Sequence, residues 1–375
     1  MAKRIAILYE DTGGGHRSTA QAVAQAISLM CPNRYETAVV NGTPYLPFPF
    51  DQGERSYPAV VNRARFIHAW LFHALNRPAM LRLLRAWLVW TGWSRASRLL
   101  RDYPADVYVS CHPLFSQLLP PVICRLQYPA RVAHVVTDLA SGHAAHFAAD
   151  LDACLVPTEQ ARQQALQHGL PPDKVILTGQ PVWPNLRERM SGGAALRASL
   201  GLRDDLPVAL MTGGGDGMGA VGPTACAIMR SALKLQLIVV CGRNEALRAE
   251  LEATPARIPL RVLGFVDNMP ELMGASDILI SKSGTLTLCE GLLAGLPILM
   301  YDAIPGQEDG NVDYLTQHGA GVFCPTPRAV VDQLRAWLGD QAQLARVREA
   351  SLRLAQPDAA FNVAREIDRL AAAVA

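Results

Sequence analysis

Short apolar runs alternate with longer segments of helical periodicity along this chain. In the first half, runs rich in aliphatic residues have the length and composition of strands: RIAILYE (4–10), YETAVVN (35–41), DVYVSC (106–111), RVAHVVTD (131–138) and ACLVPT (153–158). Strands that alternate with helices are typical of parallel sheets, because each crossover between parallel strands needs a long connection. The pattern therefore predicts an α/β fold.

A second set of strand-like runs follows a change of pattern near residue 190. Its members are PVALMTG (207–213), LQLIVVCG (235–242), LRVLGFV (260–266), DILISK (277–282) and PILMYD (297–302). Between the two sets, the stretch 178–193, which contains TGQPVWPN and MSGG, predicts a junction poor in helix. We expect two Rossmann-like domains, residues 1–185 and 194–355, that face each other across a cleft, with ligands at the carboxyl ends of the strands.

Composition narrows the class of protein. Half of the 375 residues are hydrophobic, enough for two cores, and the net charge of +2 provides no field that would attract nucleic acid. The eight cysteines include no Cys-x-x-Cys pair, so we expect reduced thiols rather than zinc ligands. No window has the ~18 apolar residues of a spanning helix, and a strand follows the N-terminus at once. Neither a membrane span nor a secretory leader is therefore expected.

One segment, residues 55–101, departs from this average composition. It has no acidic residue and contains four of the six tryptophans, Trp70, Trp87, Trp90 and Trp93. Its nine arginines are at positions 55, 63, 65, 77, 82, 85, 95, 98 and 101. Arginine and tryptophan on an apolar helical stretch are typical of a segment at a membrane surface. The alternative is a helical insertion that packs on the first sheet and presents a solvated basic face.

Two glycine loops occupy equivalent places in the two halves. DTGGGH (11–16) follows the first predicted strand and precedes a helical stretch, and TGGGDGMG (212–219) has the same position in the second half. Backbone N–H groups of such a loop, with a helix dipole behind them, can bind a phosphate without a metal ion. His16 adds a titratable group at the end of the first loop. A tight turn without a ligand is the alternative for either loop.

A further polar cluster is predicted around ILISKSGTLTLCEGLLAGLP (278–297). The strand ends at SKSG, and the following helix has Thr285 and Thr287 near its N-terminus. Glu290, in the first turns of this helix, can accept hydrogen bonds from two vicinal hydroxyls such as those of a ribose. A carboxylate that only interacts with the helix dipole is the alternative. The loop PGQEDGN (305–311) has donors and acceptors suited to a sugar, and is otherwise a polar surface loop.

The motifs DTGGGH, VVTDL, TGGGDGMG, CGRN, GFVDNMPELM and PGQEDGNVDYL, in this order, resemble those of the monoglycosyldiacylglycerol synthases. SGTLTLCEGLLAGLP is similar to the donor-binding helix of these enzymes and of the related MurG-type transferases. The resemblance implies a GT-B fold in which the tail, residues 356–375, returns to the first domain as a helix. It also implies a glycosyltransferase that moves glucose or galactose from a UDP-sugar to diacylglycerol, with inversion and without a metal or other cofactor.

The resemblance implies a donor site in the second domain. Backbone groups of Phe265 and Val266 would hold uracil, Glu290 the ribose, a glycine loop and the next helix start the diphosphate, and a polar loop the hexose. The full donor-binding set is Gly14, Gly15, Gly213, Gly214, Gly215, Arg243, Phe265, Val266, Ser283, Gly284, Thr285, Leu286, Thr287, Glu290, Gln307, Glu308 and Asn311. Related sequences often have an arginine where this chain has Trp183, and Arg243 is the candidate to replace its charge.

The first domain would take the acceptor. His16 matches the base proposed for the family, and Asp138 is the second candidate, as base or as the residue that orients His16; a helix cap is the alternative for Asp138. The set expected at the acceptor or the membrane is Trp70, Arg82, Arg85, Trp87, Trp90, Trp93, His112 and His143. We expect a cytoplasmic protein, peripheral on the anionic inner face of the cell membrane.

Other functions stay open at this point. A transferase to a polyprenyl-linked or other hydrophobic acceptor would use the same donor motifs. A UDP-sugar 2-epimerase has the same architecture but needs no lipid, so segment 55–101 argues against it. A non-catalytic binder of lipid or nucleotide would not need both His16 and Glu290. The sequence does not decide between glucose and galactose, although the common use of glucose by bacterial relatives favours glucose.

Overall fold

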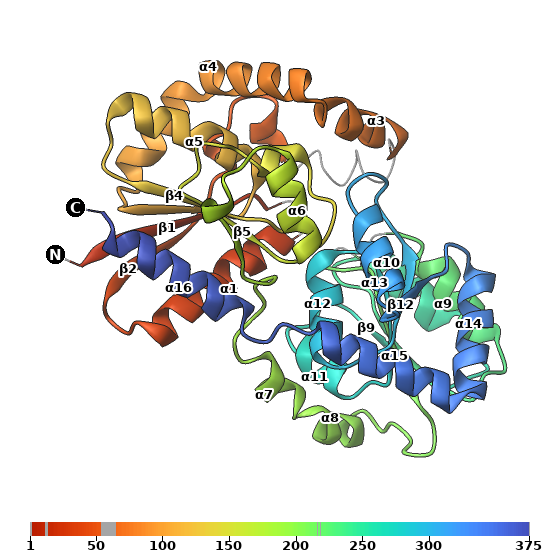
Figure 1. Cartoon of the computed structure of the whole chain (residues 1–375). Coiled ribbons are helices and arrows are strands. Elements are labelled where there is room, and N and C mark those ends of the chain that lie inside the picture. Colours follow the sequence, from red (N-terminus) through yellow and green to blue (C-terminus); the bar gives the residue numbers. More distant parts are fainter. Residues whose placement is uncertain (1, 12–13, 54–64, 216, 218, 375) are drawn as a thin grey trace. The chain divides into compact units, whose positions relative to one another are not determined.

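The computed structural model describes residues 2–11, 14–53, 65–215, 217 and 219–374. It divides into two compact units, each built on one parallel sheet (Figure 1). Unit 1 comprises Met1–Pro184, Pro305–Gly310 and Pro357–Ala375, and unit 2 comprises Asn185–Ile304 and Asn311–Gln356. The α/β class that the alternating pattern predicts is confirmed.

The sheet of unit 1 has the strand order β2-β1-β3-β4-β5-β6. Its six parallel strands are β1 Lys3–Tyr9, β2 Tyr35–Asn41, β3 Val107–Ser110, β4 Arg131–Val135, β5 Ala153–Val156 and β6 Val175–Leu177. The α-helices described in this unit are α1 Gly15–Met30, α3 Arg65–Leu75, α4 Pro78–Asp102, α5 Pro113–Leu126, α6 Glu159–Gln167 and α16 Ala359–Ala372. Short 3-10 turns are η1 Thr43–Tyr45, η2 Phe50–Gln52, η3 Ala144–His146 and η4 Pro172–Lys174.

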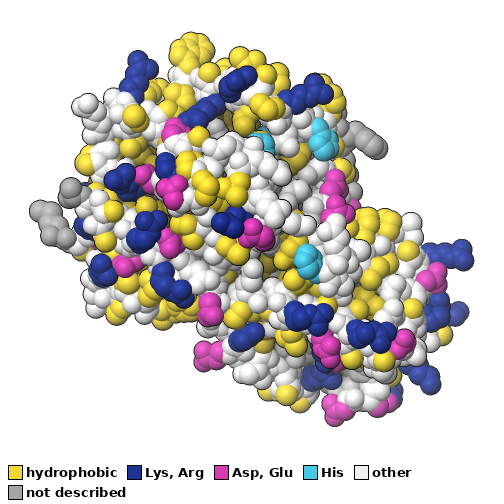
Figure 2. Space-filling view, viewed as in Figure 1, with side chains coloured by type: hydrophobic (Ala, Val, Ile, Leu, Met, Phe, Trp, Pro, Cys, Tyr) yellow, Lys and Arg dark blue, Asp and Glu magenta, His cyan; other side chains and the backbone are white. Residues whose placement is uncertain are grey.

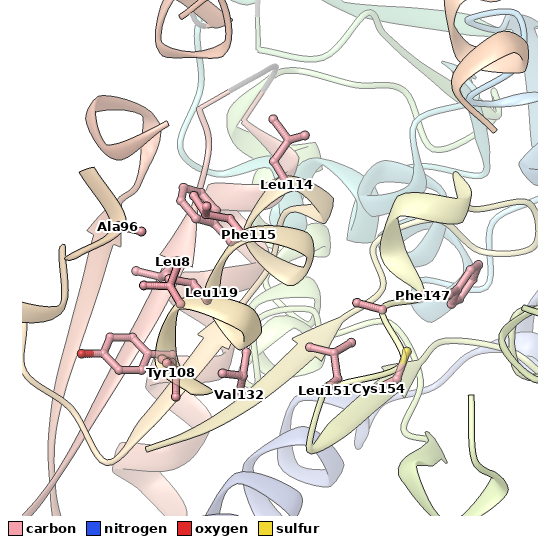
Figure 3. Close-up of a cluster of buried hydrophobic side chains, with 14 of the residues drawn as sticks. Leu8, Ala96, Tyr108, Leu114, Phe115, Leu119, Val132, Phe147, Leu151 and Cys154 are labelled. Atoms are coloured by element: carbon pink, nitrogen blue, oxygen red, sulfur yellow. The ribbon is translucent and has the colours of Figure 1, made fainter. Parts of the chain in front are cut away.

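Both faces of the unit 1 sheet are buried, which explains why its strands are apolar almost without interruption. On one face, Ile5 and Ile7 of β1 pack with α1 and α16. On the other face, Leu8 of β1 packs with Phe115 and Leu119 of α5, in the cluster shown in Figure 3. Alternate residues of a strand point to opposite faces, so one apolar run supplies both cores. These two layers fix the strand ends that carry the candidate site.

The sheet of unit 2 has the strand order β12-β11-β10-β7-β8-β9. Its six parallel strands are β7 Val208–Thr212, β8 Gln236–Val240, β9 Leu260–Leu263, β10 Ile278–Lys282, β11 Ile298–Asp302 and β12 Gly321–Phe323. The other helices that the structure describes are α7 Leu186–Met190, α8 Gly193–Ser199, α9 Val221–Arg230, α10 Glu245–Ala253, α11 Met269–Gly274, α12 Thr285–Leu293, α13 Asp309–Gln317, α14 Pro327–Gly339 and α15 Gln341–Leu354. Trp337 of α14 is fully buried in the main core cluster of this unit.

Segment 55–101 is helical where the structure describes it, as α3 and α4. Arg55 and Arg63 lie outside the described residues. Leu88 and Ala96 of α4 join the core beneath, whereas Leu83 is 64% exposed and Trp90 is 79% exposed. In Figure 2, dark blue and yellow side chains are mixed over the edge of unit 1 where Figure 1 shows α4. This helix therefore packs on one side and presents both cations and large apolar side chains on the other.

All ten strands expected from the apolar runs are present. The pattern misses β6 and β12, which are only three residues long and lie at sheet edges. The expectation of a helix-poor junction is wrong for α7, because Leu186 is buried and Arg189 pairs with Glu271 of α11 at 2.9 Å. The tail helix α16 belongs to unit 1, where its Asn362 side chain donates to the Thr178 carbonyl at 2.9 Å.

Candidate active site

The carboxyl ends of three neighbouring strands of unit 1 carry titratable side chains. Glu10 follows β1, His112 lies just after β3 and Asp138 lies just after β4. Gly14, the residue before α1, has a left-handed backbone with φ of 80°, which glycine adopts at the least cost. The helix starts at Gly15, so its first turn carries His16 to these strand ends. Thr12 and Gly13 of the first glycine loop lie outside the described residues.

His16 is half-buried and has polar neighbours on two sides. Its Nδ1 lies 3.3 Å from the hydroxyl of Thr137, and its ring meets the ring of His112 edge-on at 4.9 Å between centroids. Burial lowers the pKa of His16, and nearby Asp138 opposes this by raising it. The imidazole is therefore neutral at neutral pH and able to take a proton, with a carboxylate nearby that favours the charged form.

His112 has two structural partners. Its Nδ1 caps α5 by accepting from the Leu114 N–H at 3.5 Å, and its Nε2 lies 3.0 Å from Glu10 Oε2. Burial lowers the pKa of His112 well below its usual value, as do the neighbouring histidines. A neutral His112 with its proton on Nε2 satisfies both contacts. Glu10, only 3% exposed, is a site residue that the sequence analysis does not identify.

Asp138 is linked to two histidines that the sequence analysis also misses. Its Oδ2 lies 3.1 Å from His146 Nε2, and His146 Nδ1 lies 2.7 Å from His134 Nε2. Asp138 is not the cap of the next helical turn, η3, because that position is taken by His143. The alternative of a cap on η3 is therefore excluded, and a role for Asp138 as base or as the residue that orients His16 stays a prediction.

His143, expected near the acceptor, has a capping role. Its Nδ1 accepts from the Ala145 N–H at 3.1 Å, and its ring meets Phe72 of α3 edge-on at 4.9 Å. Burial lowers its pKa to about 4. Trp183 donates from Nε1 to Ser18 of α1 at 3.0 Å. Both residues thus have partners within unit 1 that explain their placement.

In unit 2, the second glycine loop follows β7 directly. Gly214 has φ of 79°, and its N–H donates to the Thr212 hydroxyl at 3.2 Å. Gly213 is buried and Gly215 is exposed, while Asp216 and Met218 lie outside the described residues. The loop thus presents its backbone at the end of the sheet, before α9.

Two cations lie against this loop. The Arg243 N–H donates to the Gly215 carbonyl at 2.9 Å, and the exposed Arg243 guanidinium lies over the Phe265 ring at 4.6 Å. A Cβ on Gly214 would lie 3.7 Å from Cε of Lys282, the last residue of β10. The structure therefore brings Arg243 and Phe265 together as expected for one site. Lys282 joins them, although the sequence analysis does not identify it.

The side chain of Asn311 forms hydrogen bonds with the start of α12. The Asn311 amide donates to the Ser283 carbonyl at 2.8 Å and to the Thr285 hydroxyl at 3.0 Å, and it is 1% exposed. Gly284 caps the helix without a side-chain hydrogen bond. Asn311, expected at the hexose, thus shapes the helix start in this structure, and contact with a hexose stays a prediction.

Glu290 lies in the second turn of α12, with Leu286 and Thr287 one turn before it, and all three are half-buried. Burial raises the pKa of Glu290 to about 7, and Arg189 lowers it. Gln307 and Glu308 belong to the segment Pro305–Gly310, which groups with unit 1. The three residues expected at the hexose are therefore divided between the units, and Val266, expected at uracil, is half-buried beside the 58%-exposed Phe265.

The residues expected at the acceptor or membrane have two kinds of environment. Trp70 is 68% exposed, like Trp90, and Arg82 is also exposed. Trp87 packs edge-on against Phe50, and Trp93 lies under the guanidinium of Arg125. Arg85 forms an ion pair with Asp150. The first group is largely exposed, whereas Trp87, Trp93 and Arg85 are half-buried.

Comparisons with known proteins agree with this division of the chain. Residues 16–182 match the family model described as monogalactosyldiacylglycerol (MGDG) synthase, and residues 213–365 match the glycosyltransferase family 28 C-terminal domain. The Oryza sativa subsp. japonica protein named "Probable monogalactosyldiacylglycerol synthase 3, chloroplastic" is 35% identical over 98% of this chain and 75% of its own length. The chain belongs to the monogalactosyldiacylglycerol synthase family. It is a glycosyltransferase, as the motifs imply.

Solved structures confirm the GT-B fold of this MGDG synthase family member. MurG of Acinetobacter baumannii has a TM-score of 0.63 at 18% identity, over 98% of this chain and 99% of MurG. Anabaena HepE, solved in complex with UDP-glucose, has a TM-score of 0.56 at 13% identity, over 99% of this chain and 98% of HepE. At these identities the likeness concerns the fold alone.

The expected location, in the cytoplasm at the inner face of the cell membrane, is contradicted. The rice relative and the MGDG synthases of Spinacia oleracea and Arabidopsis thaliana are named chloroplastic. The motifs of a catalytic domain describe chemistry and not a compartment, which is why they misled here. In the described part of the chain, no helix combines the length and the apolar character needed to cross a bilayer. The described residues also include no group of three or more His, Cys, Asp or Glu that could hold a metal ion.

Proposed function

We propose that this enzyme transfers a hexose from a UDP-sugar to the free hydroxyl of diacylglycerol, with inversion at the anomeric carbon. Unit 2 binds the donor, and His16 of unit 1 is the base. The observation that carries the proposal is the placement of His16 at the strand ends of unit 1, with its Nδ1 3.3 Å from the Thr137 hydroxyl and its ring 4.9 Å from that of His112. Burial lowers the pKa of His16, and the Asp138 carboxylate opposes this by raising it. Such a group is neutral before it takes a proton and is stabilised by its neighbour afterwards.

The donor assignment rests on the groups around loop 213–215. Arg243 and Lys282 lie against this loop, and the N-terminus of α12 begins without a side-chain cap. The N–H groups of a helix start and two cations are suited to a diphosphate. The proposal places uracil at Phe265 and Val266, and the ribose at Glu290. The stabilisation of the leaving diphosphate would then come from groups fixed before the reaction starts.

The chemical step needs one proton acceptor. The acceptor oxygen forms a bond to the anomeric carbon, and the bond from that carbon to the diphosphate oxygen breaks. The proton of the hydroxyl passes to a ring nitrogen of His16, and the electron pair of the broken bond leaves with UDP. Attack from the side opposite the leaving group inverts the centre, so an α-linked donor gives a β-glycoside.

Galactose is the hexose that we propose. The relatives that match nearly the whole chain are named monogalactosyldiacylglycerol synthases. The residues expected at the hexose do not by themselves separate the two sugars. The names of these relatives therefore decide the choice, against the common use of glucose by other members.

Unit 1 also offers a surface for the lipid. An open pocket of about 770 Å³ is lined by Arg82, Arg85, Ala86, Val89, Trp90, Trp93, Pro121 and Arg125. We propose that α3 and α4 contact the bilayer that holds diacylglycerol, through Trp70, Leu83 and Trp90. Diacylglycerol lies in the bilayer because of its two acyl chains, so the enzyme has to contact the bilayer surface to reach it.

A matched pair of variants tests the membrane contact. Trp90→Ala should weaken sedimentation with anionic vesicles and leave the melting temperature unchanged, because Trp90 is exposed. Trp87→Ala should instead lower the stability, by about 2 kcal/mol, because it removes packing against Phe50. Equal vesicle binding by wild type and Trp90→Ala would contradict the proposed surface.

The activity itself is tested with radiolabelled UDP-galactose, UDP-glucose and UDP-N-acetylglucosamine, each offered with diacylglycerol or with polyprenyl phosphate in mixed micelles. We expect a labelled lipid that migrates as monogalactosyldiacylglycerol, and β-linkage by NMR. Label found only on a polyprenyl phosphate or another lipid would support the alternative acceptor. Conversion of UDP-N-acetylglucosamine to its 2-epimer, without lipid labelling, would refute the transferase.

A further inference from the structure

The interior of unit 1 contains two histidines that the proposed reaction does not use directly. His134 lies in β4 and is fully buried, and His146 lies in η3 and is 2% exposed. They are in hydrogen-bond contact with each other at 2.7 Å, and His146 is in contact with Asp138 at 3.1 Å. The hydroxyl of Thr137, the residue before Asp138, lies 3.3 Å from His16 Nδ1, and the Asp138 carboxylate raises the pKa of His16. The histidines thus extend from the middle of the sheet towards the proposed base.

The chemistry of the three side chains fixes the order of donors. A carboxylate only accepts hydrogen bonds, so with Asp138 ionised the proton of His146 is on Nε2. Its Nδ1 then carries a lone pair, and His134 Nε2 donates to it. At the far end of the pair, the His134 ring has the backbone of Ser110, its neighbour on β3, as a further hydrogen-bond partner. His134 therefore donates to His146, and His146 donates to Asp138.

Burying two imidazole rings in this space lowers the stability of the fold relative to apolar side chains. Burial lowers the pKa of His134 well below its usual value, because it disfavours the charged ring. Apolar residues at both positions would avoid the cost of removing two polar rings from water. Packing alone therefore does not explain why the sheet contains a His–His pair.

We propose that His134 and His146 are positioning residues that hold the Asp138 carboxylate in one orientation beside His16. This inference rests on the proposed function, because it concerns the same base. It assigns no contact with substrate to either histidine. Their effect reaches the reaction through Asp138, which stabilises the imidazolium that His16 becomes.

The groups that face His16 determine in which direction its pKa should change when His146 is removed. Asp138 and Asp11 raise the pKa of His16, whereas His146 lowers it, and the His112 ring lies edge-on with Glu10 behind it. If His146 acted only through its own field, its loss would raise the pKa of His16. If it holds Asp138 in place, its loss frees the carboxylate, and the pKa of His16 falls.

The first experiment needs no substrate. The pKa of His16 is measured by NMR titration of histidine-labelled protein, for wild type, His146→Leu and His146→Gln, since glutamine retains an N–H donor near the position of Nε2. We expect a fall of about half a unit or more in His146→Leu and a value near wild type in His146→Gln. The exposed His168 supplies a matched control, His168→Gln, which should change nothing. An unchanged or raised pKa in His146→Leu would overturn the proposal.

The second experiment is a double-mutant cycle on kcat/KM. His146→Leu should lower kcat/KM roughly tenfold in the wild-type background and have no further effect in Asp138→Asn, because both variants remove the same oriented charge. Additive losses would contradict the inference. His134→Leu and His134→Gln repeat the test one step away, and their melting temperatures show whether the fold is intact.

The two proposals fail in different ways. A wild-type protein that transfers no hexose to diacylglycerol would refute the proposed function and leave the titration result valid. An active wild type in which His146→Leu leaves the pKa of His16 unchanged would refute the positioning chain alone.

Discussion

Both sheets are parallel and six-stranded, but the chemistry at their carboxyl ends is opposite. Unit 1 gathers four histidines and two carboxylates: His16, His112, His134, His146, Glu10 and Asp138. Unit 2 gathers a glycine loop, a helix start and two cations, Arg243 and Lys282. The first arrangement responds to protons, and the second is a set of fixed positive groups. The difference indicates a division of labour between proton transfer and anion binding.

Burial accounts for this difference. In unit 1, burial lowers the pKa values of His16, His112 and His134, so that these rings are neutral and available for hydrogen bonds. In unit 2, the Arg243 guanidinium is exposed and does not depend on burial in this way. Glu290 is the exception in unit 2, because burial raises its pKa to about 7. The predictions below test this division of labour. Glu290 tests it most sharply, because it is a titrating group in the unit assigned to anion binding.

The largest effect should come from His16→Ala. We expect turnover to fall about 100-fold or more, because the acceptor hydroxyl loses its base, and UDP affinity to stay unchanged. Steady-state assays with calorimetry of UDP binding check both parts. The exposed His318, in unit 2, gives the control His318→Ala. Near-normal turnover in His16→Ala would move the base to Asp138.

The next effect concerns Glu290→Ala. Loss of charge-assisted hydrogen bonds to the ribose should weaken UDP binding by about 1.5–3 kcal/mol at pH 8, where the carboxyl is ionised. For the same reason, wild-type UDP affinity should fall as the pH drops below about 7. Calorimetry at pH 6 and pH 8 measures both changes. The exposed Glu349 provides the control Glu349→Gln, and UDP affinity that is equal in wild type and Glu290→Ala would exclude the ribose role.

The free energy of unfolding should fall as the pH rises, whereas UDP affinity should rise. The folded state holds the proton of Glu290 up to about pH 7, whereas the unfolded chain releases it near the ordinary glutamate pKa. This contribution to stability is complete below the unfolded value and is lost as the pH rises through about 7. Glu290→Gln cannot titrate, so its melting temperature relative to wild type should rise between pH 5 and pH 8. A constant difference would show that Glu290 is not buried as described.

The smallest effect is expected for Arg243→Ala. An exposed guanidinium over an aromatic ring contributes modestly, so UDP affinity should fall about two- to fivefold, and less at high salt. Arg328, whose side chain is 93% exposed, supplies the control Arg328→Ala. A loss as large as that of Glu290→Ala would mean that one cation, rather than the loop and helix dipoles together, holds the diphosphate.

Much of the fold could be predicted because it depends on local patterns. Ten strands have apolar runs long enough to recognise, and the two glycine loops stand where strands end. β6 and β12 escape because three residues carry no periodicity. The division at Pro305–Gly310 also escapes, since grouping of a loop with one unit depends on long-range packing that a linear pattern does not record.

The candidate site could be predicted only where a motif marks it. His16, Asp138 and Glu290 stand in recognisable loops and helix starts. His134 is one polar residue inside an apolar strand, and His146 stands in a short turn, so only the folded sheet reveals their contact. Lys282 stood inside a motif of interest, SKSG, yet its approach to Gly214 depends on the pairing of β10 with β7.

The division of labour between the two sheet ends is tested most directly by measuring UDP affinity and turnover side by side on His16→Ala and Glu290→Ala. A crossed result is predicted: the first variant keeps its UDP affinity and loses turnover, and the second loses UDP affinity and recovers much of its turnover at saturating donor. If both variants lost affinity and turnover in equal proportion, the assignment of base to unit 1 and donor to unit 2 would be contradicted.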